Sequence, residues 1–288
     1  MAAMDDHVGT LLVSCPDRKG IVAFLAQVLF GHGANILDSD QHSDPVAGMF
    51  FQRIRFDASS LTTDRNALEN RVREIGERFA MNWRLTFGSA IRRVALLVSK
   101  QDHCLYDLLI RYRAGELACE IAMVISNHPD AAPIAKHFDV PFHHLPVTKD
   151  TRAEQEGEIV RLLGMASIDL IVLARYMQIL SPDLVAKYPS RIINIHHSFL
   201  PAFVGANPYR QAFERGVKLI GATSHYVTSE LDQGPIIEQA TIRVSHKDSV
   251  EELVRKGRDL EKRVLANAVR WHLDDRVLVY SNKTVVFD

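Results

Sequence analysis

The sequence predicts an α/β protein with two domains, an N-terminal ferredoxin-like βαββαβ domain and a C-terminal domain with a mostly parallel sheet. Two patterns lead to this prediction: a βαββαβ order over residues 1–88, and apolar strands that alternate with helices over residues 89–288. The length of 288 residues agrees, because it is long for a single compact unit.

The N-terminal domain is predicted from four strand-like segments and two helix-like segments. Apolar residues recur at spacings of three and four after the CPDRKG loop, which indicates a helix with Asp17 as its N-cap and a stop near Gly33. The turn between the two middle strands contains Asp44 and Pro45. The expected strands are 8–14, 35–44, 48–59 and 82–88, and the expected helices are 21–33 and 64–79.

The C-terminal domain is predicted from short apolar strands separated by helices, a pattern typical of a parallel sheet covered on both faces. The expected strands are 93–100, 120–127, 140–146, 169–176, 191–197 and 235–244. The expected helices are 103–115, 128–138, 154–166, 181–189 and 248–273, followed by a terminal hairpin over 276–287. Such sheets place their sites at the carboxyl ends of the strands.

Composition argues against several classes of protein. The net charge is −1 and neither half is strongly basic, so no nucleic-acid partner is expected. Three cysteines without paired spacing indicate a reducing compartment rather than a disulfide framework. No apolar stretch is long enough for a membrane span, and the N-terminus does not have the pattern of a signal peptide. We expect a cytoplasmic enzyme without a membrane partner.

The stretch NIHHSFLPAFVGANPY carries the first candidate site. Asn194 and His196 lie two residues apart at the end of an expected strand, so their side chains share one face. An amide donor beside an imidazole suits the stabilisation of an oxyanion. The spacing alone is also compatible with an ordinary hydrogen-bonded strand end.

The second candidate stretch is GATSHYVTSELDQGPII, which contains His225 and a carboxylate, Asp232, in a loop of Gly and Pro. An acid in such a loop is usually part of the turn, so Asp232 alone predicts little. Taken together, NIHHSFLPAF, GATSHYV and LDQGP resemble the signature of the folate-dependent formyltransferase fold over about residues 92–275. The resemblance implies that Asn194, His196 and Asp232 form the catalytic set and that His225 is an accessory histidine.

The same resemblance extends to VLARYMQILSP, which is similar to the family's loop whose backbone recognises the pterin ring. The folate contacts that it implies are Met177, Gln178, Ile179, Leu180 and His225. Folate is then the substrate, and neither a cofactor nor a metal is expected.

One departure from the family bears on the reaction. Transferases of this family carry a glycine-rich loop after the first strand, where backbone N–H groups hold the phosphate of the acceptor. This chain has no glycine between Val94 and Arg113, and Lys100, Asp102 and His103 occupy that loop. Water therefore becomes the expected acceptor. The implied reaction is hydrolysis of 10-formyltetrahydrofolate to tetrahydrofolate and formate, which feeds one-carbon and purine metabolism.

The N-terminal domain resembles an ACT domain, a regulatory module that commonly binds amino acids. The resemblance implies an effector, glycine or methionine, held by Asp17, Gly20 and Asn35. The alternative for the CPDRKG loop is structural, with Asp17 capping the helix and Gly20 allowing a tight turn. ACT domains often pair, so we expect a homo-oligomer, a dimer or a tetramer.

Other interpretations are weaker. Thirteen histidines raise the question of a metal site, but no HExxH or paired CxxC motif is present. Ser198 lacks a GxSxG elbow and Cys104 has no nucleophile motif. His197 should face away from His196 and form part of the wall. A non-catalytic sensor and a tRNA formylating enzyme are less favoured, and a ribonucleotide transferase is the main alternative.

Overall fold

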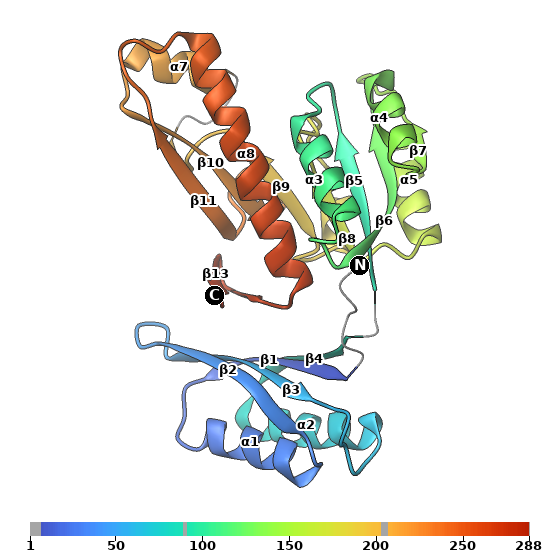
Figure 1. Cartoon of the computed structure of the whole chain (residues 1–288), viewed down its shortest axis with the longest axis vertical. Helices are drawn as coiled ribbons and strands as arrows, with labels where there is room; N and C mark the ends of the chain where they lie inside the picture. The colour runs from blue at the N-terminus through green and yellow to red at the C-terminus, as the bar shows by residue number, and fades with distance from the viewer. Residues whose placement is uncertain (1–6, 89–90, 203–206, 288) are drawn as a thin grey trace. The chain divides into compact units, whose positions relative to one another are not determined.

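The computed structural model describes residues 7–88, 91–202 and 207–287 (Figure 1). Two compact units are present, and each is described separately. The smaller unit contains the described residues up to Ile91, together with Asp275–Tyr280 and the described residues from Val285 onward. The larger unit contains Arg92–Asp274 and Ser281–Thr284. No helix in the described ranges is both long and apolar enough to cross a membrane.

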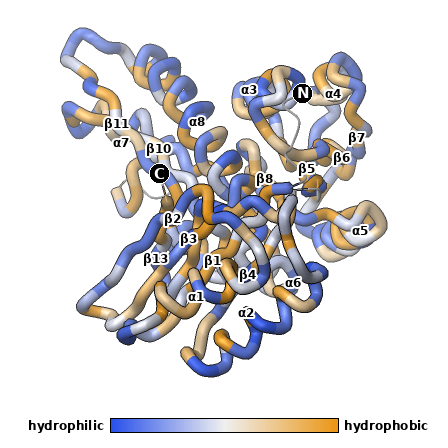
Figure 2. Tube along the Cα trace, turned by 60° about the horizontal axis from the view of Figure 1, so that its bottom comes forward, coloured by the Kyte–Doolittle hydropathy of each residue, from blue (hydrophilic) through white to orange (hydrophobic). Residues whose placement is uncertain are grey.

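The smaller unit is a four-stranded antiparallel sheet with two helices on one face, which confirms the predicted βαββαβ order (Figure 1). The strand order in the sheet is β2-β3-β1-β4. Figure 2 shows hydrophilic and hydrophobic residues alternating along α2, as expected for a helix with one buried face. The elements are β1 (Val8–Pro16), α1 (Ile21–Gly31), β2 (Asn35–Asp44), β3 (Met49–Asp57), α2 (Arg65–Phe79) and β4 (Asn82–Phe87).

Both faces of the small sheet are apolar in its centre. Leu11 and Val13 of β1 point toward α1 and α2 and belong to the main core of the unit. Leu12 points to the opposite face, where it packs in a second cluster with Phe51 and Phe287. The C-terminal segment of the chain therefore supplies part of the cover of this sheet.

The start of α1 differs from the sequence prediction. The N-cap is Gly20 in a left-handed conformation, with φ of 95°, and no side chain caps the helix. Asp17 lies three residues before that cap, and its N–H donates to the carbonyl of Gly48. The prediction of Asp17 as the N-cap is wrong, because the tight turn at Gly20 starts the helix later. The predicted stop is confirmed, because α1 ends at Gly31 and Gly33 has a positive φ.

The larger unit contains a seven-stranded sheet in the order β11-β10-β9-β8-β5-β6-β7, in which β10 runs antiparallel to both of its neighbours, β9 and β11. This confirms the predicted mostly parallel sheet. Its strands are β5 (Arg92–Val98), β6 (Cys119–Ser126), β7 (Phe142–His144), β8 (Leu170–Leu173), β9 (Ile192–His196), β10 (Leu219–Tyr226) and β11 (Ile236–Arg243). Its helices are α3 (His103–Arg113), η1 (Pro129–Ala131), α4 (Ala132–His137), α5 (Arg152–Met165), α6 (Pro182–Lys187), α7 (Pro208–Arg215) and α8 (Val250–Leu273).

Helix α8 begins with a capping box, in which Ser249 and Glu252 satisfy each other's backbone N–H groups. Its buried residues recur at helical spacing, and Glu261 lies among them. The chain ends in the predicted hairpin, formed by β12 (Val277–Tyr280) and β13 (Lys283–Val286).

The strand order fixes where a site can form. From β5 the chain moves outward through β6 and β7, and then returns to β8 on the other side of β5. The carboxyl ends of β5 and β8 therefore flank a topological switch point, the usual place for a ligand crevice in such sheets.

Candidate active site

A pocket of about 520 Å³ lies beside the carboxyl ends of β5, β8 and β9. Three segments that are distant in sequence supply most of its wall: 173–180 from the last residue of β8 onward, 194–197 at the end of β9, and 225–232 from the end of β10 into the following loop. Gln101, which follows β5, also lines it. The pocket thus occupies the switch point that the strand order defines.

Strands β9 and β10 bring three of the polar side chains together. Asn194 and His196 both line the pocket, as their spacing in the strand predicts. The antiparallel register pairs His225 with Asn194 and Thr223 with His196. Cross-strand neighbours in such a ladder are in contact range, so β10 adds its histidine directly to the Asn-x-His pair.

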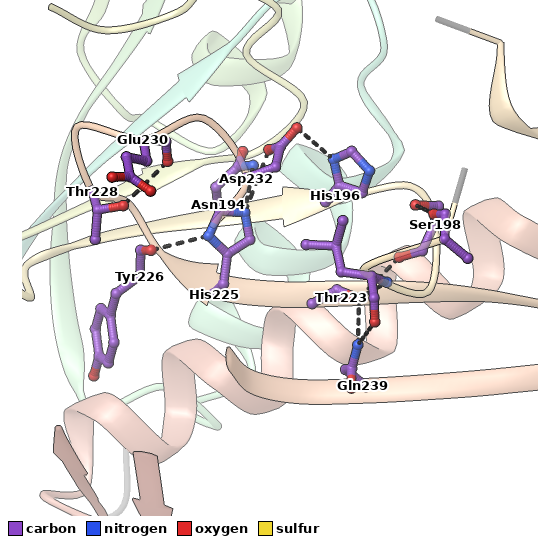
Figure 3. A network of polar contacts seen from close by, with 12 residues as sticks. Asn194, His196, Ser198, Thr223, His225, Tyr226, Thr228, Glu230, Asp232 and Gln239 are labelled. Carbon is purple, nitrogen blue, oxygen red and sulfur yellow. Dashed lines mark hydrogen bonds and ion pairs between the residues drawn. The ribbon is translucent and has the colours of Figure 1, made fainter. Parts of the chain in front are cut away.

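Asp232 completes this group from the loop after β10 (Figure 3). Its Oδ2 atom lies 3.2 Å from Nδ1 of His196, and its Oδ1 atom lies 3.6 Å from Nε2 of His225. Burial alone would raise the pKa of the Asp232 carboxyl, but the contacts with His196 and His225 lower it well below its usual range. Asp232 is therefore an anion at neutral pH. We call Asn194, His196, His225 and Asp232 the strand-end cluster.

The contacts of His225 fix the orientation of Asn194 (Figure 3). Nδ1 of His225 is 3.0 Å from the carbonyl oxygen of Tyr226, so this nitrogen carries a hydrogen and donates it. Nε2 lies 3.3 Å from Nδ2 of Asn194 and 3.6 Å from Oδ1 of Asp232, so it accepts a hydrogen from the amide when the ring is neutral and presents its own hydrogen to the carboxylate when the ring is protonated. The second amide hydrogen of Asn194 remains for another acceptor.

His196 is 6% exposed and is held on one side only. Its Nδ1 donates to Asp232, while its buried Nε2 has no hydrogen-bond partner among the described residues. Buried polar nitrogens are almost always paired, so an unpaired one at a pocket wall marks a position for a ligand atom.

The segment after His196 is fixed by Thr223 and Gln239 (Figure 3). The Thr223 hydroxyl donates to the carbonyl of Ser198 and accepts from the N–H of Leu200 and from the side-chain amide of Gln239.

The Ser198 hydroxyl donates to the carbonyl of Ala202, so its hydrogen is already used within the protein. Cys104 is fully buried, and burial raises the pKa of its thiol well above the usual value. Neither side chain resembles an activated nucleophile.

The ring of His197 lies 5.4 Å from that of His196, measured between centroids, and both residues line the pocket. His197 was expected to face away from His196, but side chains alternate between the two faces only within a strand, and β9 ends at His196. Burial first, and the nearby Arg175 second, lower the pKa of His197 to about 4. His197 is therefore a neutral part of the wall at pH 7.

All four residues of the predicted pterin-binding segment, from Met177 to Leu180, line the pocket. Two of their backbone groups already have partners within the protein. The N–H of Met177 donates to Oγ of Ser99, and the carbonyl of Ile179 accepts from the guanidinium of Arg152. The side chains of Met177 and Ile179 are largely exposed and offer apolar surface to a ligand.

A second polar group was not predicted from the sequence. We call it the arginine cluster, and its members are Gln101, His103, Arg175, Tyr209 and Glu261. Glu261 gives one signal that sequence reasoning can use, because a carboxylate lies within the apolar stripe of α8. Arg175 gives another, because it comes two residues after the buried strand β8.

Within the described residues, His103, Cys104 and Glu261 form the group whose ligand atoms all lie within 4.8 Å of one another. The carboxylate of Glu261 already accepts from His103 and Tyr209 and faces Arg175. A metal ion there would need a deprotonated thiol and the displacement of these partners. The prediction of a metal-free reaction remains a prediction.

The smaller unit has a shallow depression at the start of α1, lined by Asp17, Gly20 and residues of β2 and β3. Asn35, the third predicted effector contact, starts β2 and is not among the described residues of this lining. The structure thus brings Asp17 and Gly20 to one depression and leaves Asn35 outside it.

Two protein-family models match this chain, one in each of its two compact units. The formyl transferase family model matches residues 92–269, and the ACT domain model matches residues 9–73. The formyltetrahydrofolate deformylase of Bacillus subtilis is 54% identical over 285 residues, which cover 99% of this chain and 95% of the relative. The chain belongs to the formyltetrahydrofolate deformylase family.

Comparison with solved structures also supports membership of the deformylase family. The crystal structure of a formyltetrahydrofolate deformylase from Pseudomonas syringae has a TM-score of 0.95 and 51% identity, and the match covers 98% of this chain and 94% of that one. A glycinamide ribonucleotide transformylase from Symbiobacterium toebii has a TM-score of 0.66 and 32% identity. That match covers 71% of this chain and 98% of the transformylase, so the two catalytic folds are related.

Proposed function

We propose that this protein hydrolyses 10-formyltetrahydrofolate to tetrahydrofolate and formate, and that the strand-end cluster carries out the reaction. The observation that carries this proposal is the convergence of Asn194, His196 and Asp232 on one pocket, with the Asp232 carboxylate 3.2 Å from the His196 ring. Membership of the deformylase family supports the same reaction. The product formate and free folate then enter one-carbon and purine metabolism.

The first step is attack by water on the formyl carbon. The Asp232 carboxylate orients the water and takes one of its protons as the new C–O bond forms. The π electrons of the carbonyl move to its oxygen, which becomes an oxyanion. The free amide hydrogen of Asn194 and Nε2–H of the protonated His196 donate to that oxygen.

The second step breaks the bond between the formyl carbon and N10. The oxyanion reforms a C=O bond, and the electron pair of the broken bond stays on N10, which takes the proton held by Asp232. Formic acid and tetrahydrofolate result, and the acid loses its proton to solvent as formate. No acceptor other than water is consumed.

The segment between β5 and α3 supports water as the acceptor. Three side chains in and beside it are committed to contacts within the protein: Ser99 to Asn127 and Met177, Gln101 to Arg175, and His103, the first residue of α3, to Glu261. A phosphate cradle needs a glycine-rich turn with free backbone N–H groups. This segment has a different construction, and a ribonucleotide transferase is therefore less favoured.

The test supplies 10-formyltetrahydrofolate with and without glycinamide ribonucleotide and measures free formate. We expect formate at the same rate in both cases. Formate that is absent in both, together with formylated ribonucleotide in the second, would show a transferase and reject the proposal.

For the smaller unit we propose an amino-acid effector, glycine or methionine, bound at the depression beside Asp17 and Gly20. Deletion of residues 1–88 is a poor test, because the C-terminal segment packs on this unit. Calorimetric titration of the full chain with glycine or methionine is a better test. It compares Asp17→Ala with a control variant, Glu214→Gln, which changes an exposed ion pair with Arg210 in the larger unit. Equal amino-acid binding by both variants would remove Asp17 from the site. The predictions of a homo-oligomer and a cytoplasmic location stay predictions.

A further inference from the structure

The guanidinium of Arg175 is built into the wall of the catalytic pocket. Arg175 is 6% exposed, and its φ of 65° is a left-handed value that arginine rarely adopts. Nε and Nη2 both donate to Oε1 of Gln101, at 3.2 and 2.9 Å. One edge of the guanidinium is therefore fixed by the protein, at a backbone position that is strained.

Glu261 holds the same guanidinium from α8. This carboxylate is 1% exposed, and its Oε2 atom lies 3.5 Å from Nε of Arg175. It also accepts from Nε2 of His103 at 2.8 Å and from the hydroxyl of Tyr209 at 2.5 Å. The positive charge of Arg175 is thus balanced and its position is set by residues from three other segments, 101–103, α7 and α8.

The second edge of the guanidinium is unused. Nη1 of Arg175 is buried and has no hydrogen-bond partner among the described residues. Nε2 of His196, in the wall of the same pocket, is in the same state. The unpaired guanidinium nitrogen can only donate, so it calls for a ligand that offers an acceptor oxygen, and Nε2 of His196 can donate to a second oxygen when that ring is protonated.

We propose that Arg175 forms a subsite for a small carboxylate, and that its occupant is the formate product as it leaves the formyl position. This inference rests on the proposed deformylase reaction. Formate fits because it is planar, anionic and released where Asn194 and His196 hold the carbonyl oxygen. The guanidinium is the side chain best suited to a carboxylate.

A carboxylate has a second source, the glutamate tail of the folate. The tail lies at the end of the folate remote from the pterin, whereas Arg175 lies two residues before the proposed pterin segment 177–180. The location therefore favours formate. The two sources predict different kinetics, because loss of a tail contact raises KM and leaves inhibition by formate unchanged.

The experiment measures initial rates with added sodium formate, against sodium chloride at equal ionic strength. In the wild type we expect formate to inhibit beyond chloride. In the double variant Arg175→Gln with Glu261→Gln, which leaves no unpaired buried charge, the inhibition constant for formate should rise about tenfold or more. The matched control is Arg210→Gln with Glu214→Gln, an exposed pair with N···O of 3.5 Å, which should keep the wild-type constant.

A second variant covers the case in which the double variant does not fold. Gln101→Glu retains Arg175 but places a carboxylate on its fixed edge, and it should weaken formate binding measured by the line width of carbon-13 formate. Equal formate binding in wild type and Gln101→Glu, or no inhibition of the wild type beyond chloride, overturns the subsite. If formate binds by NMR but no formyl group is hydrolysed, the subsite stands and the proposed function fails.

Discussion

The strand-end cluster lines one pocket together with two members of the arginine cluster, Gln101 and Arg175, but the two clusters are constructed differently. The strand-end cluster comes from two paired strands and one loop, and it places two imidazoles around one carboxylate. The arginine cluster joins four separate segments, one of which carries Glu261, which is 1% exposed. Imidazoles exchange protons near neutral pH, whereas a guanidinium does not. The first cluster is suited to proton transfer and the second to holding a fixed charge.

The largest expected effect comes from Asp232, the anion of the strand-end cluster. Asp232→Asn removes the proton acceptor and the negative partner of His196, so kcat should fall about a thousandfold. Glu214→Gln, a change of the same kind in an exposed ion pair, should leave kcat unchanged. Steady-state formate release measures both, and a wild-type rate for Asp232→Asn would remove this residue from the chemistry.

The arginine cluster should respond in stability rather than in proton transfer. Glu261→Gln leaves the buried Arg175 without its counter-charge, and the free energy of unfolding should fall by about 3 kcal/mol. Adding Arg175→Gln should recover part of that loss, because no unpaired charge remains. Urea unfolding of both variants provides the measurement, and two purely additive losses would contradict the pairing.

Asn194 tests oxyanion stabilisation in the strand-end cluster. Asn194→Ala removes one amide donor and should lower kcat about a hundredfold, with a small change in KM, because the contact strengthens in the transition state. A rise in KM at constant kcat would instead assign Asn194 to substrate binding.

His225 tests how the amide of Asn194 is oriented. His225→Phe removes the acceptor 3.3 Å from Nδ2 of Asn194, and kcat should fall about tenfold. In the Asn194→Ala background the same change should cost less, since the residue being oriented is gone. Full additivity in this double-mutant cycle would show that His225 acts elsewhere.

The smallest effect concerns pH and His197. Its pKa is lowered from 6.5 to about 4, so between these values the unfolded chain binds a proton that the folded protein does not. Its contribution to stability is therefore present above pH 6.5 and is lost as the pH falls toward 4. His197→Gln should flatten the decline of Tm over this interval, and an unchanged slope would contradict the shift.

The sequence was sufficient for elements with a clear period. Strands β1 and β3 of the smaller unit, helix α8 and the terminal hairpin all follow apolar patterns and turn signals. Strand β10 was not predicted, because LIGATSHY is buried but built largely from small and polar residues. Helix α7 was missed as well, since it has only eight residues and follows Asn207, which has a positive φ.

The two clusters show the same limit at the level of the site. The i, i+2 spacing of Asn194 and His196 in one strand indicates a shared face, and the motifs add Asp232. The pairing of Arg175 with Gln101 and Glu261 spans 74 and 86 positions of the chain, and no local pattern encodes it. Only the folded arrangement reveals which buried nitrogens remain unpaired.

The most direct test of the central claim is the origin of the oxygen in formate. The protein is given 10-formyltetrahydrofolate in water enriched in oxygen-18, without any amine acceptor, and the formate is analysed by mass spectrometry. Attack by water predicts formate that carries one oxygen-18 atom per turnover. Formate without the label, or no formate at all together with a formylated amine once an acceptor is added, would contradict the account.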